Sequence, residues 1–107
     1  VMKWLGANYT VKENPGLGHQ GLYYYYHAMA KALAAAKVEK LLLESGKTAD
    51  WRKDISEVLL GNQRENGSWI NEGSSRWWES DPILVTAYAV LTLEQIYNFI
   101  PNLELSN

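Results

Sequence analysis

Four consecutive tyrosines and the histidine after them form the first group of residues that could do chemistry: Tyr23, Tyr24, Tyr25, Tyr26 and His27. A wall of tyrosine rings can bind apolar chains, stabilise cations through its π faces, or stack on sugars. A neighbouring histidine can act as an acid or base, or contact a ligand. Tyr24, Tyr25 and His27 are therefore candidate ligand contacts. The alternative is helix packing for at least two tyrosines, with His27 bonded to the backbone or to a tyrosine hydroxyl.

Two tryptophans and two acids form a second group, in the sequence RWWESD at residues 76–81. As paired carboxylates, Glu79 and Asp81 could do acid–base work on a glycosidic bond. The simpler interpretation, which we favour, is that Asp81 caps a helix and Glu79 lies near the positive end of that helix. One of Trp77 and Trp78 is expected to pack under the loop, and the other to form a rim or platform. Both are kept as candidate ligand contacts.

Three segments have the pattern of helices, and these must position the two groups. The first covers residues 21–36, whose alanine-rich second half has high helix propensity. The second covers residues 49–62, where apolar side chains fall on one stripe. The third covers residues 82–99, with Asp81 as a cap and Pro82 at the first helical position. Its first twelve residues carry no charge, which predicts burial on nearly every side.

A weak internal repeat relates the two halves of the chain. WLGAN at residues 4–8 resembles LLGNQ at 59–63, and KENPG at 12–16 resembles RENG at 64–67. The chain then holds the end of one outer helix, followed by an inner, an outer and an inner helix. This is under two units of about 55–60 residues, whereas such repeats usually need about three to close a core.

Composition excludes several classes of function. With 107 residues, 47% of them hydrophobic, the chain is long enough for one domain with a modest core. The net charge is −2 and no Lys/Arg run exceeds two residues, so nucleic acid is a poor candidate partner. No apolar run approaches the length of a membrane span. Residues 38–46 are compatible with either a helical extension or a short extended piece.

The stretch QRENGSW contains an Asn-Gly turn between a glutamine and a tryptophan. It resembles the glutamine–tryptophan motif of squalene and hopene cyclases, Q-x-x-x-G-x-W, with Gln63, Gly67 and Trp69 at the three positions. TAYAVLTLE at 86–94 and YYYYHAMAKAL at 23–33 look like the repeats shared by those cyclases and the β subunits of protein prenyltransferases. The resemblance covers most of the chain.

The resemblance implies an all-α fold, an α/α toroid in which outer helices surround inner helices. This chain would be a partial toroid. It also implies a structural role for the motif. The Gln63 amide is expected to bond free backbone groups at a neighbouring helix terminus, and the Trp69 ring to stack on the glutamine plane or nearby peptides. Gly67 would allow the tight turn between them.

The catalytic residues of the two families do not accompany the resemblance. The cyclases protonate their substrate with a D-x-D-D-T-A cluster, which aligns with PILVTA at residues 82–87. Thr86 and Ala87 match, but proline, leucine and valine hold the acidic positions. The prenyltransferases bind zinc through Asp, Cys and His, and this sequence has no Cys and two scattered His. His19 lies in a glycine-rich loop and is expected to be solvated. No catalytic residue, metal or cofactor is assigned.

Three functions are compatible with these residues. The first is an isoprenoid-related enzyme of the cyclase or prenyltransferase type, to which this segment contributes scaffold and an aromatic pocket wall. The second is a non-catalytic repeat module for binding or assembly, and the third is a carbohydrate-active toroid. Val1 precedes Met2, so we expect a segment of a longer chain. The implied partners are an isoprenoid or other apolar ligand, and either further copies or the rest of that longer chain.

Overall fold

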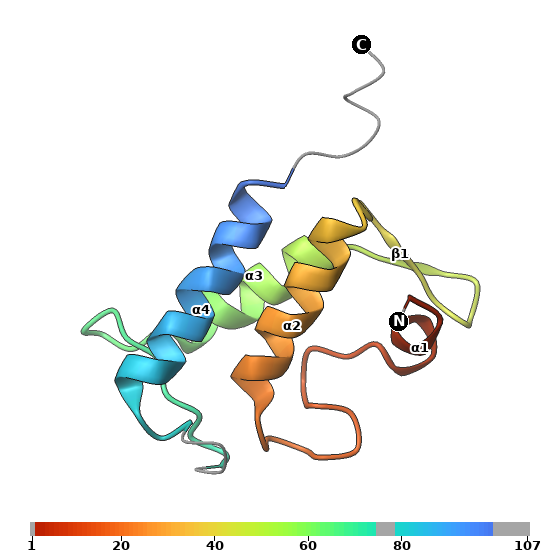
Figure 1. Cartoon of the computed structure of the whole chain (residues 1–107). Helices are drawn as coiled ribbons and strands as arrows, with labels where there is room; N and C mark the ends of the chain where they lie inside the picture. The colour runs from red at the N-terminus through yellow and green to blue at the C-terminus, as the bar shows by residue number, and fades with distance from the viewer. Residues whose placement is uncertain (1, 75–78, 100–107) are drawn as a thin grey trace.

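The chain is mostly helical. A computed structural model describes residues 2–74 and 79–99 (Figure 1). In chain order, its elements are α1 (Met2–Asn8), α2 (Leu22–Ala35), β1 (Leu41–Leu42), β2 (Thr48–Ala49), α3 (Trp51–Asn62) and α4 (Pro82–Tyr97). The three long helices agree with the sequence prediction to within two residues at each end. Within the described residues, none of the helices has both the length and the apolar character needed to span a bilayer.

Local chemistry accounts for the helix ends. The Asp50 side chain accepts a hydrogen bond from the backbone N–H of Lys53 at the start of α3, as an N-cap does. Asp81 does the same for Ile83 at the start of α4, with proline following as the first helical residue. Helix α2 ends where Lys37 adopts a left-handed conformation, with φ of 57°. The Val38 N–H then bonds the Leu33 carbonyl, which closes the helix in the usual C-terminal motif.

For residues 38–46 the sequence was compatible with a helical extension or a short extended piece. The structure shows an extended piece at Leu41–Leu42. Strands β1 and β2 form a small antiparallel hairpin in which Leu41 pairs with Ala49 and Leu42 with Thr48. Side chains alternate across a strand, so Leu41 is buried while Leu42 is exposed. Helix α1 packs beside this hairpin, where the Gly6 carbonyl accepts a bond from the Glu44 N–H.

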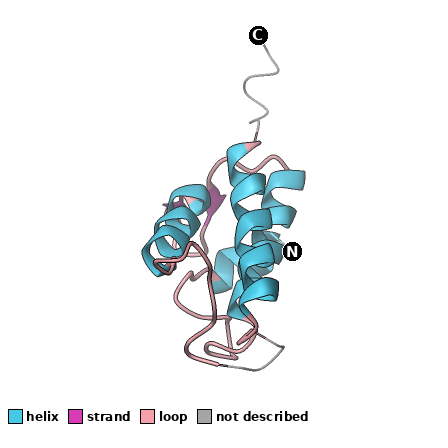
Figure 2. Cartoon of the chain, turned by 90° about the vertical axis from the view of Figure 1, so that its left-hand side faces the viewer, coloured by secondary structure: helices cyan, strands magenta, loops and turns pink. Residues whose placement is uncertain are grey.

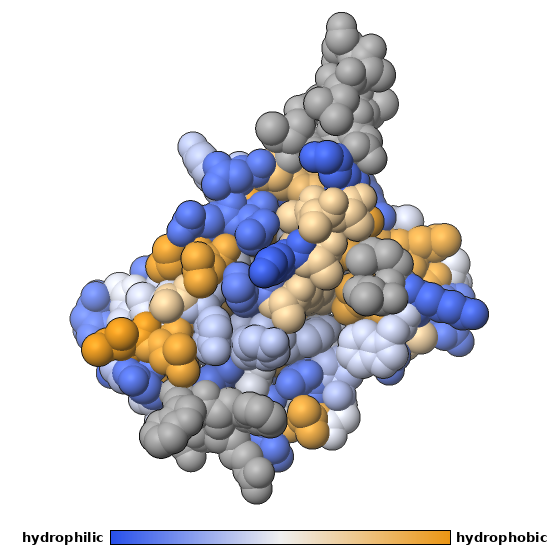
Figure 3. Space-filling view, viewed as in Figure 1, coloured by the Kyte–Doolittle hydropathy of each residue, from blue (hydrophilic) through white to orange (hydrophobic). Residues whose placement is uncertain are grey.

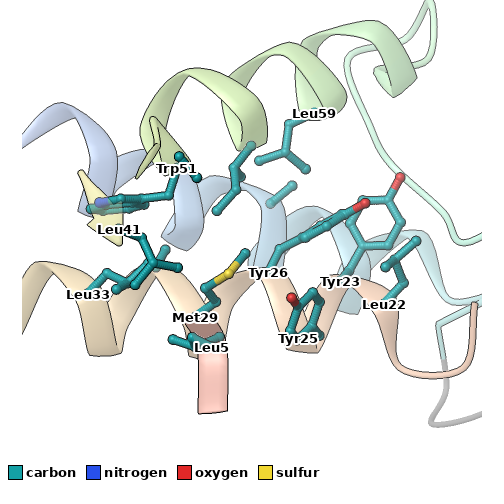
Figure 4. Close-up of a cluster of buried hydrophobic side chains, with 14 of the residues drawn as sticks. Leu5, Leu22, Tyr23, Tyr25, Tyr26, Met29, Leu33, Leu41, Trp51 and Leu59 are labelled. Atoms are coloured by element: carbon teal, nitrogen blue, oxygen red, sulfur yellow. The ribbon is translucent and has the colours of Figure 1, made fainter. Parts of the chain in front are cut away.

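The helices form two layers. Helices α2 and α4 lie side by side, and α3 covers one face of this pair (Figures 1 and 2). The core lies between the layers, where Trp51 and Leu59 of α3 point towards Tyr26 and Leu33 of α2 (Figure 4). The Trp51 indole N–H bonds the carbonyl of Val38 at 2.7 Å, so this buried ring leaves no polar atom unpaired.

The prediction that α4 is buried on nearly every side is wrong. Its fully buried residues are Val85, Ala89 and Thr92, whereas Ile83 is 81% exposed and Val90 43% exposed. The reason is geometric: within the described chain, α2 and α3 approach α4 from one side only. The absence of charge in the first twelve residues of α4 therefore reflects an apolar surface with an open flank.

The two halves share a backbone feature as well as a faint sequence similarity. After α1, the Asn14 N–H bonds the Gly18 carbonyl and the Leu17 N–H bonds the Asn14 carbonyl. After α3, the Arg64 N–H bonds the Ser68 carbonyl and the Gly67 N–H bonds the Arg64 carbonyl. Each turn leads into one of the paired helices. The order helix, turn, paired helix thus occurs twice.

Candidate functional site

An aromatic cluster joins α2 to α4 on the face of the helix pair that α3 does not cover. The rings of Tyr24 and Tyr88 meet edge to face, with centroids 5.8 Å apart, and the rings of His27 and Tyr88 stack at 6.2 Å. Tyr24 and His27 are three residues apart, so they lie on the same side of α2. Tyr24 is 56% exposed. The cluster, defined here as Tyr24, His27 and Tyr88, therefore presents a ring to solvent.

The surroundings of His27 favour the neutral form of its imidazole. Partial burial against the cluster lowers the pKa of His27 below its ordinary value of 6.5, and the positive charge of Lys31 lowers it further. Lys31 lies one helical turn along α2. A neutral imidazole has one donor and one acceptor nitrogen. The neutral form of His27 can therefore both donate and accept a hydrogen bond.

The other three tyrosines of the run belong to the core. Tyr23, Tyr25 and Tyr26 are each at most 7% exposed. The Tyr25 hydroxyl donates to the carbonyl of Thr10 at 2.8 Å, and the Tyr26 hydroxyl donates to the carbonyl of Val11. Burial raises the pKa of both hydroxyls. Tyr25 was a candidate ligand contact, and the structure places it in packing, because successive helical residues point in different directions.

Trp77 and Trp78 lie outside the described residues, so their expected role as ligand contacts stays a prediction. Tyr88 was not chosen from the sequence. Its position in TAYAVLTLE gave no signal by itself, because its meeting with Tyr24 depends on how α2 and α4 pair. Once that pairing is known, the single tyrosine within the first fifteen residues of α4 becomes an evident partner for the tyrosine run.

Glu79 caps a helix far away in the sequence. This carboxylate is fully buried and accepts backbone N–H bonds from Tyr23 and Tyr24, both at 3.0 Å. The Asn71 side chain donates to it at 3.0 Å and also donates to the carbonyl of His19. Such N–H groups in a first turn have no partner within the helix, and they favour a negative charge.

The two acids of RWWESD thus serve different helices. Asp81 caps α4, as expected, with its carboxylate 2.9 Å from the Ile83 nitrogen. Glu79 was expected near the positive end of the same helix, but it caps α2. Gly21, the N-cap residue of α2, has no side chain that could accept the free N–H groups of the first turn. Glu79 accepts two of them instead. With both carboxylates held by backbone donors, they do not form an acid–base pair facing a groove.

The glutamine–tryptophan stretch joins α3 to α4 through its tryptophan. Trp69 is 3% exposed, and its indole N–H donates to the carbonyl of Leu59 at 2.8 Å. Leu59 is in the last turn of α3, where carbonyls lack helical partners. The Trp69 backbone N–H donates to the hydroxyl of Thr86 in α4 at 3.0 Å. Trp69 therefore supplies a donor to one of the free carbonyls at the end of α3 and is also bonded to α4.

Gln63 has a more local role than expected. It is the C-cap residue of α3, is exposed, and its side-chain amide donates to the carbonyl of Gly67 at 3.0 Å. The bond closes the turn that begins at Gln63 itself. A side chain starting from the end of α3 is already next to this turn, which explains why it does not reach another helix. Gly67 has φ of 87°, which a glycine adopts without strain.

A pocket of about 650 Å³ lies elsewhere, between the start of α2 and the end of α3. Tyr23 and Tyr26 form part of its floor, but both are almost fully buried. Its lining mixes apolar side chains, such as Val58 and Ile70, with exposed polar residues, such as Asn62 and Glu65. Tyr24 is the exposed member of the tyrosine run, so we place the candidate site at the aromatic cluster.

Among residues 2–74 and 79–99, no group of three or more metal-binding side chains converges. No protein family, curated protein or solved structure matches the chain. What the geometry defines is a mostly helical fold in which α3 covers the pair of α2 and α4, and this pair carries an exposed aromatic cluster.

Proposed function

We propose that the chain is part of an α/α toroid similar to the squalene and hopene cyclases and the protein prenyltransferase β subunits. In this proposal, α1 and α3 are outer helices, and α2 and α4 are inner helices. The support is the alternation of the two kinds of helix, the repeated turn, and the Trp69 contacts that tie an outer helix to an inner one. The inner pair would then face the lumen with the side that α3 leaves open.

We further propose that this open face binds an apolar ligand of the isoprenoid class. The observation that carries the proposal is the aromatic cluster of Tyr24, His27 and Tyr88. Leu84 and Leu91 lie one turn before and one turn after Tyr88, so they extend its apolar surface along α4. In the space-filling view, hydrophobic side chains are exposed over both α2 and α4 (Figure 3). Flat π faces beside aliphatic side chains suit unsaturated hydrocarbon chains.

A non-catalytic binding module is the second candidate, and one observation favours it. Val85 occupies one of the positions that hold acids in the cyclase motif, and it is fully buried. An acid at this position would need a buried partner. Binding at the aromatic cluster is therefore what we propose for this part of the chain, and any chemistry would need residues outside it.

Farnesol binding, followed by saturation-transfer NMR, tests the proposal. We expect transfer to the farnesol methyl groups, and weaker binding in Tyr24→Ala and Tyr88→Ala. An aromatic contact is worth about 0.5–1.5 kcal/mol, so each change should weaken binding up to about tenfold. Tyr97→Ala is the matched control, because Tyr97 is on the same helix, 89% exposed, and outside the cluster.

Two results would contradict the isoprenoid proposal. One is equal farnesol binding by the cluster variants and the control. The other is the absence of transfer to farnesol together with transfer to methyl glucoside, which would favour the carbohydrate alternative.

A further inference from the structure

The open flank of α4 lies on the side opposite the aromatic cluster. Ile83 is 81% exposed and Val90 is 43% exposed, and Ala87 is exposed between them. These three residues share one side of the helix, because they are spaced by four and three residues. Tyr88 is turned about 140–160° away from Ile83 and Val90 at 3.6 residues per turn. We call Ile83, Ala87 and Val90 the α4 flank.

The opposite end of the molecule also exposes large apolar side chains. Helix α1 and the β1–β2 hairpin lie on the far side of α2 from α4 (Figure 1). There Trp4 is 51% exposed and Leu42 is 67% exposed, while their neighbours Leu5 and Leu41 point into the core. We call the surface around Trp4 and Leu42 the hairpin end. The ends of a repeat array are normally covered by polar residues, whereas both of these surfaces expose large apolar side chains among the residues that the structure describes.

Charge separates the two ends. Exposed lysines at the hairpin end are Lys3, Lys40 and Lys47. In the part of the chain that the structure describes, none of the three takes part in an ion pair.

The acids near the hairpin end do not cancel this charge. Glu39 is paired with Arg52, which leaves Glu44 as the remaining acid of the hairpin. At the other end, the exposed charges on α4 and its cap are the acids Asp81 and Glu94. Two α4 flanks facing each other would bring these acids together, which is unfavourable. An α4 flank facing a hairpin end would bring opposite charges together.

We propose that copies of this chain associate head to tail, with the α4 flank of one copy against the hairpin end of the next. The order helix, turn, paired helix would then continue from one copy into another. Such a contact uses two different surfaces, so it leads to a closed ring or to an open array rather than to a symmetric dimer. This inference does not depend on the proposed ligand.

Two variants, each blocked at one end, test the arrangement. Ile83→Lys with Val90→Lys places positive charge on the α4 flank, and Trp4→Glu with Leu42→Glu places negative charge on the hairpin end. All four residues are exposed, and far-UV circular dichroism checks that both variants stay folded. Each should be a monomer of about 12 kDa by light scattering. A 1:1 mixture should give dimers of twice that mass, because each variant keeps one complementary end.

The unchanged chain should have a mass above 12.2 kDa that rises with concentration and falls with added salt. Glu57→Lys, on the exposed face of α3, is the control for altered charge and should assemble like the unchanged chain. A monomeric unchanged chain at micromolar concentrations would overturn the proposal. So would a mixture of the two variants that stays monomeric, or a hairpin-end variant that still assembles normally, since this last result indicates symmetric contact between α4 flanks.

Discussion

Glu79 accepts a hydrogen bond from the backbone of Tyr23 across 56 residues of sequence. The second oxygen of the same carboxylate accepts from Tyr24, so one buried side chain serves two of the free N–H groups of α2. Glu79→Ala should lower the free energy of unfolding by about 2–6 kcal/mol, because each buried N–H left without an acceptor costs about 1–3 kcal/mol. Glu79→Gln, which keeps one acceptor oxygen, should cost less.

Chemical denaturation of both variants measures this cost. Glu65→Gln is the control, because Glu65 is exposed and should change stability by less than about 0.5 kcal/mol. A Glu79→Ala protein as stable as the control would mean that the carboxylate does not cap α2.

Trp69→Ala should be among the most damaging single changes, at about 3–5 kcal/mol. The ring is 3% exposed and its N–H satisfies the end of α3. Trp69→Phe keeps most of the packing and should lose mainly the hydrogen bond, about 1 kcal/mol. Leu60→Ala is the control, since Leu60 is next to the Trp69 acceptor Leu59 and is 62% exposed. Equal melting temperatures for Trp69→Ala and Leu60→Ala would contradict a structural role for Trp69.

Gln63→Ala should cost less than Trp69→Ala. The glutamine is exposed and holds one bond within its own turn, so about 0.5–1.5 kcal/mol is expected. A loss as large as that of Trp69→Ala would show that Gln63 reaches further than this turn. The comparison separates the two members of the motif, which the sequence treats alike.

Stability should fall as the pH is lowered through the range below 6.5. The pKa of His27 is lower in the folded chain than its ordinary value of 6.5, so the unfolded chain binds the proton more readily. The His27 contribution is therefore complete above pH 6.5 and is lost as the pH falls towards the lowered pKa. Thermal melts between neutral and mildly acidic pH should give a shallower decline for His27→Gln than for the unchanged chain. Lys31→Met should also reduce the slope, because it removes the second cause of the shift.

The chain alone should not cyclise squalene. Protonation of an alkene needs a strong, preorganised acid, and Pro82, Leu84 and Val85 occupy the positions where the cyclase motif has acids. Incubation with squalene followed by mass spectrometry checks this expectation. A cyclised product formed by this chain, and not by a heat-denatured sample, would contradict it.

Much of the fold could be predicted because its signals are local. Propensity, the Asp50 and Asp81 caps and the proline after Asp81 act over a few residues, and they place the helices correctly. The partner of Glu79 could not be predicted, because the groups it caps lie 55 and 56 residues away. The cluster at Tyr88 was missed for the same reason. The burial of α4 was overestimated because an apolar sequence does not say whether a neighbour is present.

The long-range cap at Glu79 also bears on the order of folding. During synthesis, α2 leaves the ribosome before Asn71 and Glu79 do, so its first turn has no carboxylate to hold it at that stage. Asn71 and Glu79, which are synthesised later, complete the cap of α2. The two repeat-like halves should therefore fold and unfold as one cooperative unit. Amide hydrogen exchange at Tyr23 and Tyr24 would report on this directly. Those two amides should be protected only for as long as the loop around Glu79 stays closed, although they belong to the earlier half of the chain.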